Sequence, residues 1–187
     1  MGLALGAGEF GLAGAGKAAP RQVKTNANIL ILGAGAAGAA LANRLIERLD
    51  GATITLVDGR REHWYQPGFS LIAAGLKPAS YSVSQTTDWL PSDVTLKQDW
   101  AANIDPEARK VALAGGEVLS YDYLIVATGL SLDHDAIEGF SLDMVGQDGI
   151  GALYAGPDYA AKTWQAASKF TEDGGVGLFT RPATEMK

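Results

Sequence analysis

The sequence predicts an α/β fold in which a parallel sheet is covered by helices and extended by a small β-meander. Two short apolar runs, residues 28–32 and 53–57, are typical of strands buried on both faces of a parallel sheet. Residues 36–49 between them are rich in alanine and leucine and carry their charges on one side, which indicates a helix. These segments form a βαβ unit of about 30 residues, whose crossover makes the two strands parallel.

Later segments extend this pattern. Residues 63–90 are irregular and aromatic, which indicates loops and short helices over a ligand. Residues 94–119 predict two or three short strands, and residues 123–127 predict another buried strand. Residues 159–170 are typical of an amphipathic helix, and residues 175–180 of a strand that starts a second dinucleotide-type domain.

The composition is that of a globular protein and excludes several functions. The 187 residues are 47% hydrophobic and 19% charged, with a net charge of -6 and no dense run of lysine or arginine, so no nucleic-acid partner is expected. No apolar run reaches the about 18 residues of a membrane-spanning helix, which leaves peripheral membrane contact open. The chain has no cysteine and therefore no disulfide and no cysteine nucleophile.

A glycine-rich turn after the first strand carries the main chemical signal. Gly33, Gly35 and Gly38 satisfy the pattern G-x-G-x-x-G between a strand and a helix. The first glycine allows the tight turn, the second lets the backbone approach a diphosphate, and the third allows close packing of helix and strand. The backbone N–H groups of Ala36 and Ala37 are predicted to bind the diphosphate at the positive end of the helix.

Asp58 ends the second strand, 20 residues after Gly38. A carboxylate at this place accepts hydrogen bonds from the hydroxyls of a ribose. The residues therefore predict an adenosine diphosphate half, which belongs to either NAD or FAD. The alternative for the glycine motif is a turn that binds no ligand. The alternative for Asp58 is a solvated aspartate in a turn.

Two features favour FAD. Short strands within residues 94–119, rather than a second βαβ unit, resemble the β-meander of FAD-binding domains. Residues 121–129 (YDYLIVATG) resemble the strand and ATG motif of two-dinucleotide-domain flavoproteins. That resemblance implies a Rossmann-like FAD-binding domain in which the backbone of Thr128 and Gly129 passes close to the FAD.

Within these flavoproteins the chain resembles the sulfide:quinone oxidoreductases. Residues 63–75 (HWYQPGFSLIAAG) are similar to that family's segment H-x-Y-Q-P followed by L-x-x-A-G. The resemblance implies that Gln66 lies near the FAD and that the backbone of Ala101 holds the edge of the adenine. It also implies oxidation of sulfide, with electrons passing through FAD to a membrane quinone.

Residues 163–170 and 176–187 resemble the segment that leads into the second domain of this family. The resemblance places the first redox cysteine directly after Lys187 and the second far downstream, so no catalytic residue is assigned within the chain. It also places beyond Lys187 the return segment of the FAD domain, the quinone pocket and the membrane-facing helices. We therefore expect an incomplete FAD domain that is inactive on its own and holds FAD weakly or not at all.

The resulting organisation has three parts. Residues 1–25 are interpreted as a flexible tail or a remnant of an export signal, residues 26–140 as the FAD-binding domain, and residues 141–187 as a connection and the start of a second domain. The expected location is peripheral on the inner membrane, on the periplasmic side if the tail is an export signal and otherwise on the cytoplasmic side. The oligomeric state is not predicted.

Three alternatives remain open. A type II NADH:quinone dehydrogenase should carry a second G-x-G-x-x-G soon after the ATG motif, and residues 174–180 do not fit that pattern. A sulfide dehydrogenase flavoprotein would pass its electrons to a cytochrome. A non-catalytic, truncated nucleotide-binding fragment is the alternative outside the enzymes.

His63 and His134 lack the partners for a metal site, and the four tryptophans are interpreted as packing residues.

Overall fold

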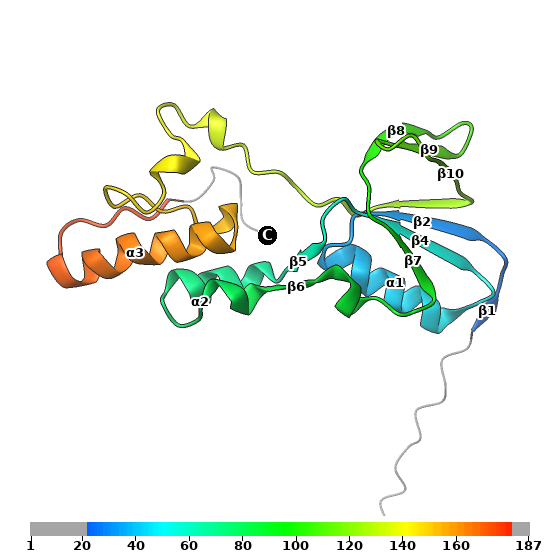
Figure 1. Cartoon of the computed structure of the whole chain (residues 1–187), viewed down its shortest axis with the longest axis horizontal. Helices are drawn as coiled ribbons and strands as arrows, with labels where there is room; N and C mark the ends of the chain where they lie inside the picture. The colour runs from blue at the N-terminus through cyan, green and yellow to red at the C-terminus, as the bar shows by residue number, and fades with distance from the viewer. Residues whose placement is uncertain (1–21, 181–187) are drawn as a thin grey trace, which may run out of the picture.

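A four-stranded parallel sheet organises the computed structural model, which describes residues 22–180 (Figure 1). All three strand pairs run parallel, which confirms the predicted fold class. The order across the sheet is β11 (Tyr123–Val126), β2 (Asn28–Leu32), β4 (Thr53–Val57) and β7 (Val94–Lys97).

The central strands are mostly apolar because both faces of the sheet are covered. Helix α1 (Ala36–Arg48) packs on one face, where Ile29 and Ile31 point into its core cluster. Leu30 and Leu32 alternate with them and pack on the opposite face, against strands of the meander. Figure 1 shows this arrangement of helix, sheet and meander as three layers.

The meander consists of β8 (Ala101–Asp105), β9 (Lys110–Leu113) and β10 (Val118–Ser120), which pair antiparallel. Residues 94–119 therefore hold four strands rather than two or three. The first of them, β7, pairs parallel with β4 and belongs to the main sheet. The residues of a short strand do not reveal the sheet to which it belongs, because its pairing partner lies far away in the sequence.

Two short strands close the outer end of the βαβ unit. β1 (Val23–Lys24) pairs parallel with β3 (Leu49–Asp50), and the N–H of Thr25 donates to the carbonyl of Asp50 at 2.9 Å. Val23–Lys24 thus belongs to the folded part, although the sequence placed residues 1–25 in a tail. A strand of two residues is too short to show a period. Residues 1–21 of that tail, including its apolar stretch, lie outside the described residues.

Residues after β4 build a second part around two helices. α2 (Phe69–Ala73) packs on α3 (Pro157–Asp173) through the buried side chains of Phe69, Ile72 and Ala160. The antiparallel pair β5 (Glu62–Trp64) and β6 (Val83–Gln85) leads from the sheet to these helices. Short 3₁₀ helices complete the loops: η1 (Gln66–Gly68), η2 (Ala79–Ser82), η3 (Thr86–Trp89), η4 (His134–Ala136), η5 (Leu142–Met144) and η6 (Leu153–Ala155).

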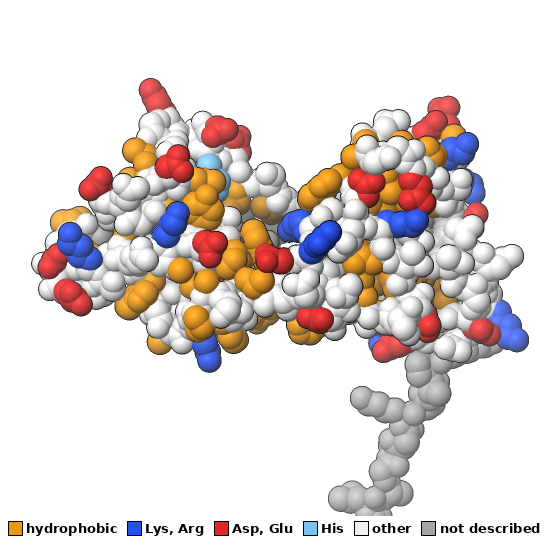
Figure 2. Space-filling view, viewed as in Figure 1, with side chains coloured by type: hydrophobic (Ala, Val, Ile, Leu, Met, Phe, Trp, Pro, Cys, Tyr) orange, Lys and Arg blue, Asp and Glu red, His pale blue; other side chains and the backbone are white. Residues whose placement is uncertain are grey.

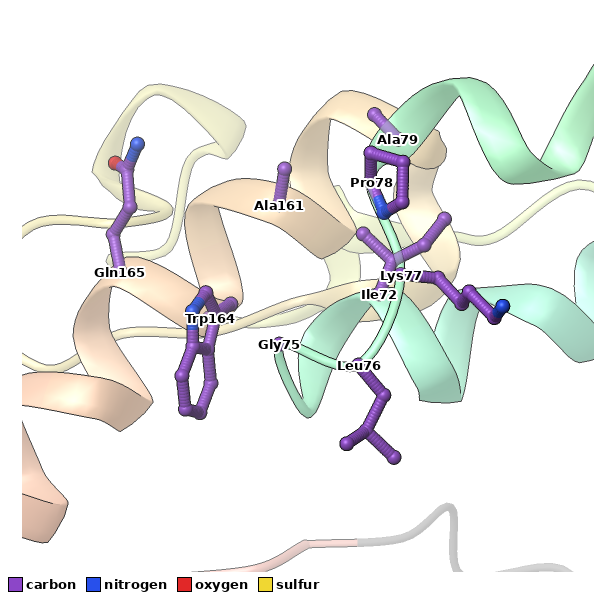
Figure 3. A pocket seen from close by; sticks show the side chains of 9 residues that line it. All are labelled: Ile72, Gly75, Leu76, Lys77, Pro78, Ala79, Ala161, Trp164 and Gln165. Atoms are coloured by element: carbon purple, nitrogen blue, oxygen red, sulfur yellow. The ribbon is translucent and has the colours of Figure 1, made fainter.

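A glycine that follows α2 packs against α3. Gly75 has a φ of +72°, and a Cβ atom there would collide with the indole ring of Trp164. Both residues line the shallow groove between the helices in Figure 3. The two segments that resemble the same family in sequence are therefore in direct contact.

The strand expected at residues 175–180 does not form. These residues adopt neither helix nor strand and pair with none of the described strands, and Val176, Leu178 and Phe179 are exposed. Residues 181–187, which precede the expected cysteine position, lie outside the described part. Figure 2 shows further hydrophobic side chains on the surface around α2 and α3. Leu76 and Tyr154 are also exposed. No helix within residues 22–180 is long and apolar enough to span a membrane.

Replacing Gly75 by alanine should destabilise the protein. The substitution forces an L residue into a left-handed conformation and also pushes a methyl group into the Trp164 ring. We expect a loss of about 1–3 kcal/mol in the free energy of unfolding, measured by urea denaturation. Gly139→Ala is the matched control, because Gly139 has a φ of +76° and open space around its Cβ position. Equal losses in the two variants would show that the indole contact contributes nothing.

Candidate dinucleotide-binding site

The glycine-rich turn, Asp58 and Thr128 lie at the carboxyl edge of the parallel sheet. The glycine-rich turn follows β2, Asp58 follows β4, and Thr128 follows β11 closely. Two hydrogen bonds align these ends: the N–H of Gly33 donates to the carbonyl of Val57 at 2.8 Å, and the N–H of Asp58 donates to the carbonyl of Lys97 at 3.1 Å. Ligands of open α/β sheets bind at this edge.

Gly33 brings the turn against the ATG segment. Its φ is +100°, and a Cβ atom would collide with the carbonyl of Ala127 and lie 3.0 Å from the Cα of Thr128. Only glycine permits this approach. Thr128 therefore lies beside the glycine-rich turn, and Thr128 and Gly129 are both exposed.

Gly38 and Gly35 have opposite environments, as their predicted roles require. A Cβ atom on Gly38 would collide with the carbonyl oxygen of Gly33, so the first turn of α1 packs directly on the loop. A Cβ atom on Gly35 would meet nothing within 4 Å. The open space in front of Gly35 is where a diphosphate would lie.

Within residues 22–180, no side chain caps the amino end of α1. Gly35 is the N-cap residue and offers no side-chain cap, and the first turn contains no acidic residue. Ala36 and Ala37 are exposed there, with small side chains that leave their backbone accessible. Free N–H groups and the helix dipole favour an anion at this position, so these residues fit a dinucleotide diphosphate.

Asp58 follows β4, the strand next to β2. The residue is buried, with only 5% of its surface exposed. Oδ2 accepts the N–H of Ala34 at 2.7 Å, and Oδ1 accepts the N–H of Arg60 at 2.9 Å. Burial raises the pKa of this carboxyl, but the side-chain hydrogen bond from Arg60, the two backbone donors and the charge of Arg60 together lower it below its ordinary value. The carboxylate is thus kept ionised as an acceptor.

Two side chains that the sequence left without a role support this geometry. Arg60 forms an ion pair with Asp58, with 3.3 Å between Nη2 and Oδ2. Nδ1 of His63 lies 3.3 Å from the carbonyl oxygen of Ala34, and its ring packs on Trp89 at 5.7 Å between centroids. The D-x-R spacing was visible in the sequence, whereas the contact of His63 with the turn depends on how β5 is placed.

Gln66 and Ala101 lie on other elements. Gln66 starts the 3₁₀ helix η1 and is exposed, and its proximity to FAD stays a prediction. Ala101 starts β8 and is exposed too, directly after Trp100, whose indole ring contacts Gly59 beside Asp58. This neighbourhood is consistent with the predicted adenine edge, which no contact tests.

Gly35→Val should abolish nucleotide binding without unfolding the protein. The new side chain occupies the open space before the helix, so the affinity for ADP should fall by at least about tenfold, whereas the free energy of unfolding should change by about 1 kcal/mol or less. Isothermal titration and urea denaturation measure the two quantities. Gly38→Val is the control that should unfold the chain. Unchanged ADP affinity in folded Gly35→Val protein would place the diphosphate elsewhere.

Asp58→Asn should lower stability by about 1–3 kcal/mol at neutral pH, because the amide has a single acceptor oxygen and cannot accept both the Ala34 N–H, now on Oδ2, and the Arg60 N–H, now on Oδ1. The folded pKa of Asp58 is lowered, so its contribution is complete above the unfolded pKa of about 3.9 and disappears as the pH falls below that value. Urea denaturation from pH 6 to pH 3 should show the two proteins converging. A gap that widens on acidification would contradict the account, and Asp93→Asn, an exposed residue, is the control.

Comparison with known proteins identifies the family of the chain. The sequence model of the pyridine nucleotide-disulphide oxidoreductases matches residues 27–161. Mitochondrial sulfide:quinone oxidoreductase of Mus musculus is 34% identical over 186 residues, which cover 93% of this chain and 40% of that protein. Its counterpart of Dictyostelium discoideum is 31% identical over 168 residues, covering 89% of this chain and 36% of that protein. The chain thus spans well under half the length of these relatives.

Solved structures support the fold. Sulfide:quinone oxidoreductase of Aquifex aeolicus is 22% identical, with a TM-score of 0.57 over 79% of this chain and 33% of that chain. NDH2 of Plasmodium falciparum, solved in complex with NADH, is 21% identical, with a TM-score of 0.54 over 75% of this chain and 28% of that chain. FAD, the cofactor predicted from the sequence, is the one that this family binds. The resemblance to sulfide:quinone oxidoreductases is confirmed by the relatives, and the chain belongs to the pyridine nucleotide-disulphide oxidoreductase family.

Proposed function

We propose that this chain is the FAD-binding, amino-terminal part of a sulfide:quinone oxidoreductase. The observation that carries the proposal is the similarity over 93% of the chain to a protein of that name. The contact between Gly75 and Trp164 supports it, because it joins the two segments that resemble this family beyond the general nucleotide motif. The motif alone would fit any flavoprotein of the larger family.

The chain's own residues would hold and orient the cofactor. The amides at the start of α1 would bind the diphosphate, and Asp58 would accept the ribose hydroxyls after some rearrangement of Arg60. Thr128 and Gly129 would pass close to the dinucleotide on the other side of Gly33. When bound, FAD supplies a carrier that accepts and releases two electrons.

The reaction that the proposal assigns to the longer protein balances simply. Sulfide loses two electrons and its sulfur passes to a thiolate, while the quinone gains two electrons and two protons. A thiolate is needed because it is both a good nucleophile and a good leaving group in sulfur exchange. The 187 residues contain no cysteine, so the sulfur step requires residues that this chain does not supply, and we expect the chain alone to be inactive.

A quinone acceptor implies contact with a membrane surface. The proposal places this contact, and the quinone pocket, in parts that follow Lys187 in similar proteins. The protein would be peripheral on the inner membrane, and its side would depend on whether residues 1–25 carry an export signal.

The test uses the chain together with the coding sequence that follows Lys187. Sequencing this DNA should reveal a cysteine within the first codons, and the resulting protein should reduce a soluble quinone with sulfide but not with NADH. Replacing that cysteine by serine should abolish the activity and leave the flavin absorbance unchanged. Reduction by NADH alone would favour the type II dehydrogenases, and transfer to cytochrome in place of quinone would favour the sulfide dehydrogenases. A stop codon with no bound flavin would leave a non-catalytic fragment.

A further inference from the structure

Trp100 is a large exposed aromatic residue beside the ribose acceptor. Its indole lies directly on the backbone of Gly59, where a Cβ atom would collide with the ring atoms Cε2 and Nε1. Gly59 follows Asp58 in the chain, so the indole is adjacent to the buried carboxylate. Despite this contact, Trp100 remains 58% exposed. An aromatic ring that only filled the core would be far less exposed.

The backbone of Trp100 is held in place on both sides. Its N–H donates to Oδ1 of Asp99 at 2.7 Å, and its carbonyl accepts the N–H of Ala114 at 2.8 Å. Oδ2 of Asp99 in turn accepts the N–H of Gly115 at 3.0 Å. The meander therefore fixes the peptide from which the indole projects, which lowers the entropy cost of using the ring as a contact surface.

The sheet order indicates which part of a nucleotide would reach this ring. The diphosphate turn follows β2 and the ribose acceptor follows β4, so a bound nucleotide runs from β2 across β4 toward the next strand, β7. Trp100 follows β7 by three residues. The base of a nucleotide whose ribose is on Asp58 would therefore lie in front of the exposed indole.

We infer that Trp100 is a stacking surface for the adenine of the bound dinucleotide. The exposed ring offers a flat apolar face to a purine, and stacking of a base on an aromatic side chain is the contact that such rings make with nucleotides. Gly59 is then part of the same stacking surface, since any larger residue at this position would displace the indole. This inference rests on binding of the adenosine diphosphate half at Asp58, as the proposed function requires.

The test titrates ADP and inorganic pyrophosphate into wild-type chain and into Trp100→Ala and Trp100→Phe. Loss of the ring should weaken ADP binding by about 5- to 150-fold, and Trp100→Phe should retain most of the affinity. Pyrophosphate, which has no base, should bind Trp100→Ala as well as wild type. Circular dichroism and thermal unfolding check that each variant is folded.

Tryptophan fluorescence gives a second readout. Saturating ADP should quench the emission of wild type and of Trp164→Phe, whose replaced ring lies between α2 and α3, but not that of Trp100→Phe. Equal ADP affinity in folded Trp100→Ala would overturn the stacking role while leaving the ADP site intact. Parallel losses for ADP and pyrophosphate would also overturn it, because they would mean that Trp100 only supports the fold. Absence of ADP binding by wild type would overturn both the stacking role and the site.

Discussion

The close approach of Gly33 to the end of β11 is the constraint on which the site depends. Because Gly33 has no side chain, the turn after β2 lies on the backbone of Ala127 and Thr128, and Gly38 lets α1 pack on the same turn. The helix is thereby directed with its amino end toward the carboxyl edge of the sheet. Asp58 is fixed to this turn through the N–H of Ala34, so the predicted ribose acceptor and the predicted diphosphate donors are positioned by one small set of contacts.

The parts of the fold with strong local signals were predictable from the sequence. The runs at 28–32 and 53–57 are apolar on both faces because α1 and the meander cover the sheet from either side, and their ends match the observed strands. The glycine spacing and the position of Asp58 predicted which residues come together at the carboxyl edge of the sheet, since each residue has a local backbone role; their binding of a dinucleotide stays a prediction. Strand β7 was assigned to the meander because its partner, β4, lies almost forty residues earlier.

What the sequence did not reveal depends on contacts between distant segments. The packing of Gly75 on Trp164 joins residues that are 89 positions apart and required the placement of α3 on α2. The tryptophans were interpreted as packing residues, yet Trp100 is largely exposed next to the ribose acceptor. The pKa of Asp58 likewise reflects a balance between burial and the Arg60 partner, which residue identity alone does not determine. Residues 175–180 were predicted to form a strand from their apolar pattern. No described strand pairs with them, and they form no strand.

The most direct test of the central claim is a crystal structure of the chain grown with millimolar ADP. The account predicts diphosphate density in front of Gly35, within hydrogen-bonding distance of the N–H groups of Ala36 and Ala37, and the ribose on Asp58. ADP bound at any other place, with the amino end of α1 left without a ligand, would contradict it.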